Sequence, residues 1–203
     1  MLSFCVSCNN TEKLNCNNLL EKYKAFEQTK NPDTLVFVHQ IDDLIISYKN
    51  CERAYQLGFR PYLNLGDTAK AKRYLLKALN INDLSIYTLY GLSGFYSIES
   101  KNDSALKYIN IALSIKLDSN GVYYDQSDFW GPSFDIEYHE LIFLRGIIYF
   151  ETSNYKKANR DFFEAVNNGH EKKEAYEYLA NSYLFFGKKD SANYYDKLSK
   201  VLP

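Results

Sequence analysis

The chain has 203 residues, of which 46% are hydrophobic and 24% charged, a balance that is ordinary for a globular protein and argues against disorder. Its net charge of −1 lacks the strong positive field expected of a nucleic-acid binder, so a nucleic-acid partner is not predicted. Nineteen Tyr and 13 Phe accompany only nine Gly and four Pro, which favours helices over a many-turned β fold.

Residues 1–16 are predicted to be an N-terminal tail. Its first eight residues are mostly apolar or small and end at Cys8, and they resemble the end of a bacterial lipoprotein signal. The resemblance implies lipidation at Cys8, a location in the cell envelope or periplasm, and contact with a membrane only through that anchor. The alternative is an unmodified tail on a cytoplasmic protein. Export would also allow a disulfide between Cys16 and Cys51.

Residues 17–50 hold two helical patterns of apolar residues, separated by Asn31, Pro32 and Asp33. Asp33 is a suitable N-cap for the second pattern. The pair has none of the small-residue spacing found further along the chain. We therefore predict a degenerate helical pair that acts as an N-terminal cap.

A periodic spacing of small residues follows from residue 51 onward. Ala71 and Ala105 are 34 residues apart, and so are Ala158 and Ala192. The interval between Ala105 and Ala158 is 53, which is one such period plus 19 residues. Thirty-four residues is the period of a helix–turn–helix repeat.

The residues around these alanines recur as well. In each unit a large residue, a small or apolar pair and a Tyr precede the Ala, and an apolar residue generally follows four positions later. The four sets are Tyr55, Gly58, Phe59, Tyr62, Ala71 and Leu75; Leu89, Leu92, Ser93, Tyr96, Ala105 and Ile109; Ile142, Arg145, Gly146, Tyr149, Ala158 and Phe162; and Tyr176, Leu179, Ala180, Tyr183 and Ala192, with Asp196 at the last position. This pattern resembles the tetratricopeptide repeat.

The resemblance implies an all-α fold, a right-handed α-solenoid of stacked helix–turn–helix repeats with about ten helices. Four units would occupy residues 51–203, interrupted by an aromatic loop insertion at 118–135. Turns are expected at 65–67, 100–102, 153–154 and 187–188, where Gly or polar residues occur. Pro61 is expected to kink or shorten the first leading helix.

In this family the leading helix of each repeat lines a concave groove that binds a protein or peptide. The matching residues here, together with two from the insertion, are the candidate partner-binding residues. They are Arg53, Gln56, Arg60, Tyr87, Tyr90, Ser97, Glu140, Phe143, Ile147, Phe150, Glu174, Glu177, Asn181, Tyr124 and Trp130. The groove would be basic at one end, aromatic in the middle and acidic at the other end.

The insertion carries the only Trp of the chain, with Tyr123, Tyr124 and Phe129 close by. One interpretation makes these aromatic residues a platform at the edge of the groove that contacts the partner. The other makes Trp130 a plug between the second and third units. Either the last helix caps the solenoid through its polar face, or its exposed end forms a homodimer contact.

No constellation of catalytic residues is complete. Gly91 to Gly94 begins like a nucleophile elbow but lacks the second Gly at the right spacing, and Phe143 stands where a zinc-protease motif starting at His139 needs its second His. We predict no enzyme activity, no metal and no cofactor. The leading hypothesis is an envelope-associated adaptor; the alternatives are an immunity-type inhibitor of a toxin or enzyme and a cytoplasmic module in transcriptional control.

Overall fold

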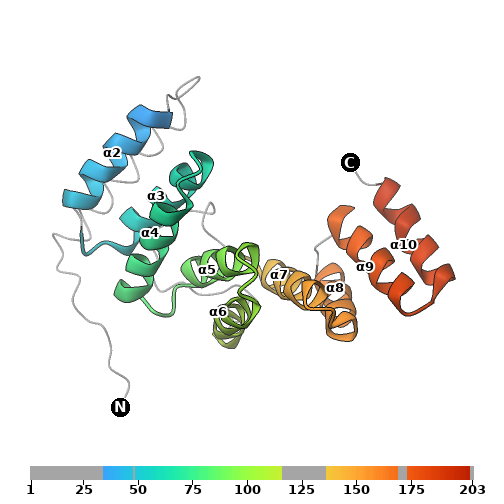
Figure 1. The fold of residues 1–203 in the computed structure, drawn as a ribbon. Coiled ribbons are helices and arrows are strands. Elements are labelled where there is room, and N and C mark those ends of the chain that lie inside the picture. Colours follow the sequence, from blue (N-terminus) through green and yellow to red (C-terminus); the bar gives the residue numbers. More distant parts are fainter. Residues whose placement is uncertain (1–33, 48, 116–135, 169–172, 202–203) are drawn as a thin grey trace, which may run out of the picture. The chain divides into compact units, whose positions relative to one another are not determined.

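The computed structural model describes residues 34–47, 49–115, 136–168 and 173–201 (Figure 1). These residues contain nine α-helices, so the predicted all-α fold is confirmed. They form two compact units that meet in the sequence between Asp83 and Leu84. The domain boundaries predicted from the sequence, at residues 16 and 50, stay predictions.

The first unit contains α2 (Thr34–Ser47), α3 (Glu52–Asn64) and α4 (Thr68–Ile81). Helices α3 and α4 form a hairpin, and α2 packs on α3. α2 corresponds to the second of the two apolar patterns at 17–50, and it buries Val38, Ile41 and Ile45. The first pattern and Asp33 lie outside the described residues.

Gly58 lets α4 approach α3 closely in the first unit. A Cβ atom at this position would lie 2.6 Å from the Tyr74 ring and 3.1 Å from Ile41. Because the backbone of α3 lies against the Tyr74 ring at this position, any larger side chain would force Tyr74 away.

Pro61 does not shorten its helix as expected. α3 contains 13 residues and ends at Asn64, the same length as α5 and α6, although Pro61 is inside it. Pro61 sits in the last turn of the helix, and its carbonyl accepts a 3.0 Å bond from the amide of Leu65. The proline therefore costs one hydrogen bond without ending the helix early.

The second unit contains three helical hairpins, which are numbered second to fourth because the α3–α4 hairpin of the first unit is the first. They are formed by α5 (Ile86–Ile98) with α6 (Asn102–Ser114), α7 (Tyr138–Glu151) with α8 (Tyr155–Asn167), and α9 (Lys173–Phe185) with α10 (Lys189–Val201). Successive hairpins stack, since α6 contacts α7 and α8 contacts α9 (Figure 1). The insertion at 118–135 lies outside the described residues, and the hairpins on its two sides pack directly on each other.

The periodic small residues occupy the helix contacts that the sequence predicts for them. Ala71, Ala105 and Ala158 are fully buried, and Ala192 is nearly so. In the second hairpin the Ser93 hydroxyl donates to the Ala105 carbonyl at 3.0 Å, which ties the two helices together. A small side chain at these positions lets the paired helices approach closely. A single hairpin of this kind cannot bury its own apolar face, so stacking on neighbouring hairpins supplies the core.

The four predicted turns are confirmed, and they share one backbone feature. Gly66, Ser100, Ser153 and Gly187 all have positive φ angles, between 56° and 79°. They occupy the same position in successive hairpins, 34, 53 and 34 residues apart. At the last three, the next residue's amide donates back to the carbonyl of a repeat Tyr at 2.8 to 3.0 Å. This is the Schellman arrangement that ends a helix with a left-handed residue.

Cys51, just before α3, forms a disulfide bond. The chain's other cysteines precede the described residues, so the predicted pairing with Cys16 and the predicted lipidation of Cys8 are not tested. Within the described residues, no helix is both long and apolar enough to cross a bilayer.

The last helix, α10, presents a mainly polar outer surface. Ala192 and Ser199 are buried, Tyr195 is half-buried, and Asp196 is exposed and bound to Lys200 at 2.6 Å. Its exposed apolar side chains are Tyr194 and Val201. This surface fits the prediction of a self-capping helix, while the predicted homodimer contact stays a prediction.

Candidate functional site

Arg53 and Gln56, two of the predicted groove residues, are buried in the first unit. Arg53 donates from Nη1 to Oε1 of Gln56 at 2.8 Å, and Gln56 donates in turn to Glu52. Glu52 also accepts a 2.9 Å bond from Asn82 at the end of α4. Because Arg53 and Gln56 are only 6% and 1% exposed, they offer little surface to a partner, whereas Arg60 is exposed.

Asp42 joins α2 to the first hairpin, which the sequence analysis missed. Tyr62 and Lys70 donate to one carboxylate oxygen of Asp42 at 2.6 and 2.7 Å, and the Tyr74 hydroxyl donates to the other. Burial opposes ionisation of Asp42, but these hydrogen bonds outweigh it and hold the pKa of the carboxyl below its ordinary value. The only sequence signal was a charged residue beside the apolar stripe of residues 35–48.

The leading helices α5, α7 and α9 lie next to one another along the second unit. Within each of these helices, residues three and four positions apart lie on the same face. The same repeat positions on the three helices therefore form one surface. We call this surface the leading-helix face. It consists of Tyr87, Tyr90 and Gly94 from α5; Glu140, Phe143 and Ile147 from α7; and Glu174, Glu177 and Asn181 from α9.

On α5 the leading-helix face is open at Gly94. Tyr87 is buried and Tyr90 is half-exposed beside it. A Cβ atom built on Gly94 would meet no atom within 4 Å, in contrast to the crowded Gly58 and Gly146. Packing therefore does not explain the glycine, which costs helix stability relative to Ala. The sequence analysis did not select Gly94.

On α7 the predicted aromatic residues are half-buried in a cluster. Phe143 and Phe150 both contact Tyr178, with ring centroids 5.9 and 5.4 Å apart, and both contact Phe162. Ile147 packs against the same cluster. Phe143 and Phe150 thus contact the same two rings on adjacent helices, and their role in binding a partner stays a prediction.

The polar members of the leading-helix face have two different roles. Glu140 accepts a 3.1 Å bond from the amide of Glu137 and so caps the start of α7. Glu174, Glu177 and Asn181 on α9 are exposed. Ser97, a predicted groove residue that is not part of this face, is buried and donates to Glu151 at 2.8 Å.

Several predicted site residues are not placed together. Tyr124, Trp130 and Cys8 lie outside the described residues. Arg53, Gln56 and Arg60 belong to the first unit and the remaining predicted residues to the second. A single groove running from Arg53 to Asn181 stays a prediction.

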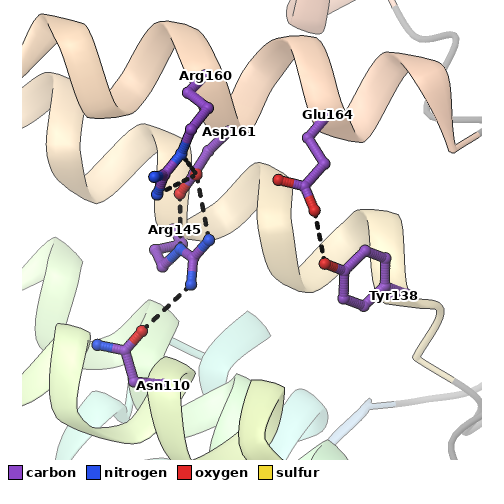
Figure 2. Close-up of polar contacts among 6 residues, drawn as sticks. All are labelled: Asn110, Tyr138, Arg145, Arg160, Asp161 and Glu164. Atoms are coloured by element: carbon purple, nitrogen blue, oxygen red, sulfur yellow. Dashed lines mark hydrogen bonds and ion pairs between the residues drawn. The ribbon is translucent and has the colours of Figure 1, made fainter.

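The second unit also contains a buried ion pair (Figure 2). Arg145 on α7 donates from Nε and Nη2 to the two oxygens of Asp161 on α8 at 2.6 and 3.1 Å, and Asp161 is fully buried. Arg145 also reaches Asn110 on α6 at 3.4 Å. Burial disfavours the charge of Arg145, but its bonds to Asp161 outweigh burial and raise its pKa. The network links the second hairpin to the third.

A second polar contact ties α7 to α8 further along (Figure 2). The Tyr138 hydroxyl donates to Glu164 at 2.6 Å. Burial, together with this hydrogen bond, raises the pKa of Tyr138 to about 12. Tyr138 therefore remains a donor throughout the neutral range. Over the described ranges, no three His, Cys, Asp or Glu side chains gather where they could hold a metal ion.

No family model and no curated protein matches the sequence. Solved structures do match, over nearly the whole chain. PilW, a "widely conserved type IV pilus biogenesis factor", is 18% identical with a TM-score of 0.70, over 95% of this chain and 78% of that one. MamA from Desulfovibrio magneticus RS-1 is 13% identical with a TM-score of 0.69, over 97% of both chains. YrrB, "a TPR protein with an unusual peptide-binding site", is 16% identical with a TM-score of 0.61, over 94% and 86%.

The chain has the tetratricopeptide-repeat fold. At these identities the likeness shows the fold alone, and the repeats of this chain have their own chemistry. In three of the four repeats, two Tyr residues lie twelve positions apart. Tyr62 and Tyr74 meet edge to face at 5.4 Å, whereas Tyr96 with Tyr108 and Tyr183 with Tyr195 stack at 5.5 and 5.4 Å.

The third tetratricopeptide repeat departs from this rule. The position of the second Tyr holds Asp161, and the position of Gly58, Leu92 and Leu179 holds Arg145. The two departures are partners, since they form the buried ion pair. A residue-by-residue alignment of the four repeats shows both departures. A search for small and apolar positions alone does not.

Proposed function

We propose that the chain is a non-catalytic protein-interaction scaffold of the cell envelope, whose leading-helix face binds a segment of a partner protein. The fold is that of a repeat scaffold, and such stacks present extended binding surfaces. The observation that carries the proposal is the leading-helix face itself, with half-exposed aromatic residues, the open position at Gly94 and exposed Glu174, Glu177 and Asn181.

The character of this face suits a peptide or protein segment. Phe143 and Ile147 are held in place by the cluster beneath them, so they would contact a partner at small entropic cost. The carboxylates on α9 add a region that favours basic groups of a partner. At Gly94 a partner backbone could approach the helix closely, because no side chain stands in the way.

A photo-crosslinking experiment in the native cell tests the binding face. A photoreactive phenylalanine derivative is placed at Gly94 or Ile147, and in a matched control at Lys107, which is exposed on the second helix of its repeat. We expect a discrete protein adduct from positions 94 and 147 and none from 107. Equal adducts from all three positions, or none from 94 and 147, would contradict the proposal.

The envelope location rests on the resemblance of residues 1–8 to a lipoprotein signal, and the disulfide at Cys51 is compatible with it. Disulfides persist in oxidising compartments such as the periplasm and are rare in the cytoplasm. The proposal includes lipidation at Cys8. Metabolic labelling with an alkyne fatty acid, from the natural gene with its upstream sequence, is expected to label the protein and to fail for Cys8→Ser. Labelling that persists in this variant would exclude Cys8 as the anchor.

A further inference from the structure

An exposed apolar surface lies where α9 ends and α8 begins, and we call it the aromatic edge. It consists of Tyr155, Leu184, Phe185 and Phe186. The three residues from α9 and the following turn are consecutive and are 55%, 59% and 44% exposed. The rings of Tyr155 and Phe185 are in contact, so exposed apolar surface is continuous between the two helices, which is typical of an interaction surface.

The aromatic edge is held rigidly. The rings of Tyr155 and Phe185 stack with centroids 3.8 Å apart and an interplanar angle of 7°. Phe150 meets both rings edge to face, at 5.2 and 5.9 Å. The Ser182 hydroxyl donates to the Tyr155 carbonyl at 3.3 Å and fixes the two helices locally. A partner would therefore meet a preformed surface.

Four lysine residues lie close in sequence to the residues of the aromatic edge. Lys156 and Lys157 follow Tyr155, while Lys188 and Lys189 follow Phe186, and all four are exposed. The acidic residues nearby in sequence are Glu151, which accepts the Ser97 hydroxyl, and Asp190. The ammonium groups of Lys157 and Lys188 lie over the rings of Tyr149 and Tyr183, at 5.1 and 5.9 Å from the ring centroids. The residues next to the edge in sequence therefore carry more positive than negative charge.

We propose that the aromatic edge docks an acidic segment of a protein partner, with an apolar side chain inserted on the Tyr155–Phe185 stack and flanking carboxylates facing the lysines. This deepens the proposed function and rests on it, because Asn181, Leu184 and Phe185 lie on one side of α9. The expected segment carries Asp or Glu on both sides of a Leu or Phe.

Two other occupants fit the charges less well. A second copy docking through the same patch would bring the lysines of the two copies together, since a two-fold interface pairs a surface with itself. An anionic membrane surface lying along α9 would also meet Glu174 and Glu177, which are exposed on the same helix. A narrow peptide segment avoids both repulsions.

Fluorescence anisotropy with the full chain tests the proposal. The probe is a labelled synthetic peptide of Asp and Glu with central Leu and Phe; a second probe has Lys in place of the acids. We expect binding of the acidic probe only, weakened by added salt and reduced about tenfold or more by Phe185→Ser or by Lys188→Glu with Lys189→Glu. Ile98→Ser is the matched control, because Ile98 holds the same repeat position as Phe185 and is 80% exposed.

Each contrary outcome overturns this inference. These are equal binding of both probes or of neither, unchanged binding by the Phe185 and lysine variants, and an equal loss in Ile98→Ser. Phe185-dependent dimerisation in sedimentation equilibrium, or Phe185-dependent binding to phosphatidylglycerol vesicles without peptide binding, would assign the edge to another occupant. Adducts at positions 94 and 147 that persist in Phe185→Ser, with no probe binding, would leave the proposed function standing and remove only the aromatic edge.

Discussion

The two joints between hairpins of the second unit hold together by different chemistry. Between α8 and α9 the contact is aromatic, with Phe162 stacked on Tyr178 at 4.9 Å and Phe185 stacked on Tyr155. The joint between the second and third hairpins, which we call the polar joint, is crossed by two side-chain hydrogen bonds, from Arg145 to Asn110 and from Ser97 to Glu151. The repeat spacing is interrupted at the polar joint by the 19 additional residues.

This difference shows that the repeat period specifies which helices are in contact, but not which interactions hold them together. Both joints place a second helix against the next leading helix. Aromatic stacking tolerates small lateral shifts, whereas the bidentate pair of Arg145 and Asp161, which holds α7 against α8 within the third hairpin, requires one geometry. The pair thereby fixes the guanidinium of Arg145 in the position from which it bonds to Asn110, at 3.4 Å, across the polar joint.

The largest expected effect comes from breaking the aromatic joint. Phe162→Ala removes a fully buried ring that contacts Phe143, Phe150 and Tyr178, and should lower the free energy of unfolding by about 3 to 5 kcal/mol. Urea unfolding followed by circular dichroism measures the loss. Phe163→Ala, at the exposed neighbouring position, should cost less than about 1 kcal/mol. Equal losses in the two variants would contradict the assigned joint.

Breaking the ion pair should cost about 3 kcal/mol. Asp161→Asn leaves the buried Arg145 guanidinium without its carboxylate. Arg160→Ala is the control, because that side chain is two-thirds exposed and lies 3.4 Å from Asp161, so its loss should be about 0.5 kcal/mol or less.

The double change Arg145→Leu with Asp161→Tyr sharpens the same test. It installs the residues that the second and fourth repeats have at these positions. Since well-packed apolar residues can replace a buried ion pair without loss, it should recover most of the stability lost in Asp161→Asn. A double variant as unstable as Asp161→Asn would show that apolar residues cannot replace the ion pair at this position.

Two glycine substitutions should have opposite signs. Gly146→Ala places a Cβ 2.7 Å from the Phe162 ring and should destabilise by about 1 to 3 kcal/mol. Gly94→Ala meets open space and should stabilise by about 0.5 to 1 kcal/mol through helix propensity. Thermal melting of both variants distinguishes a packing glycine from one on the binding face; destabilisation by Gly94→Ala would contradict the open position.

The smallest expected effect is at the turns. Ser100 and Ser153 hold positive φ angles where the first and fourth hairpins have Gly. Ser100→Gly and Ser153→Gly should each raise the free energy of unfolding by about 0.5 to 1 kcal/mol, because Gly adopts this conformation without Cβ strain. Ser104→Gly, within α6, serves as the control and should lower stability. A loss at the two turns would contradict the assigned strain.

Much of the architecture could be predicted from the sequence. The interval of 34 residues between Ala71 and Ala105 and between Ala158 and Ala192 located the hairpins. Turn chemistry at Gly66 and Gly187 located their ends. These features are local, because a helix face and a turn depend on residues within a few positions of each other.

The candidate site was less predictable. Tyr90 and Phe143 were selected by their repeat positions, and both are half-exposed on the leading-helix face. Arg53 and Gln56 were selected by the same rule, yet they bond to each other and to Glu52 in the first unit. The repeat position indicates on which face of its helix a side chain begins. A long polar side chain can then bend toward whichever hydrogen-bond partner lies within reach.

By itself, the sequence determined the helical period, the pairing of helices into hairpins and the turns between them, because these follow from short-range spacing. Only the tertiary structure decided that Asp161 pairs with Arg145, and that Phe185 stacks on Tyr155. It also decided that Asp42 accepts hydrogen bonds from Tyr62, Tyr74 and Lys70. Each of these contacts joins different helices. Their partners depend on the register between packed helices, which no single segment of the chain encodes.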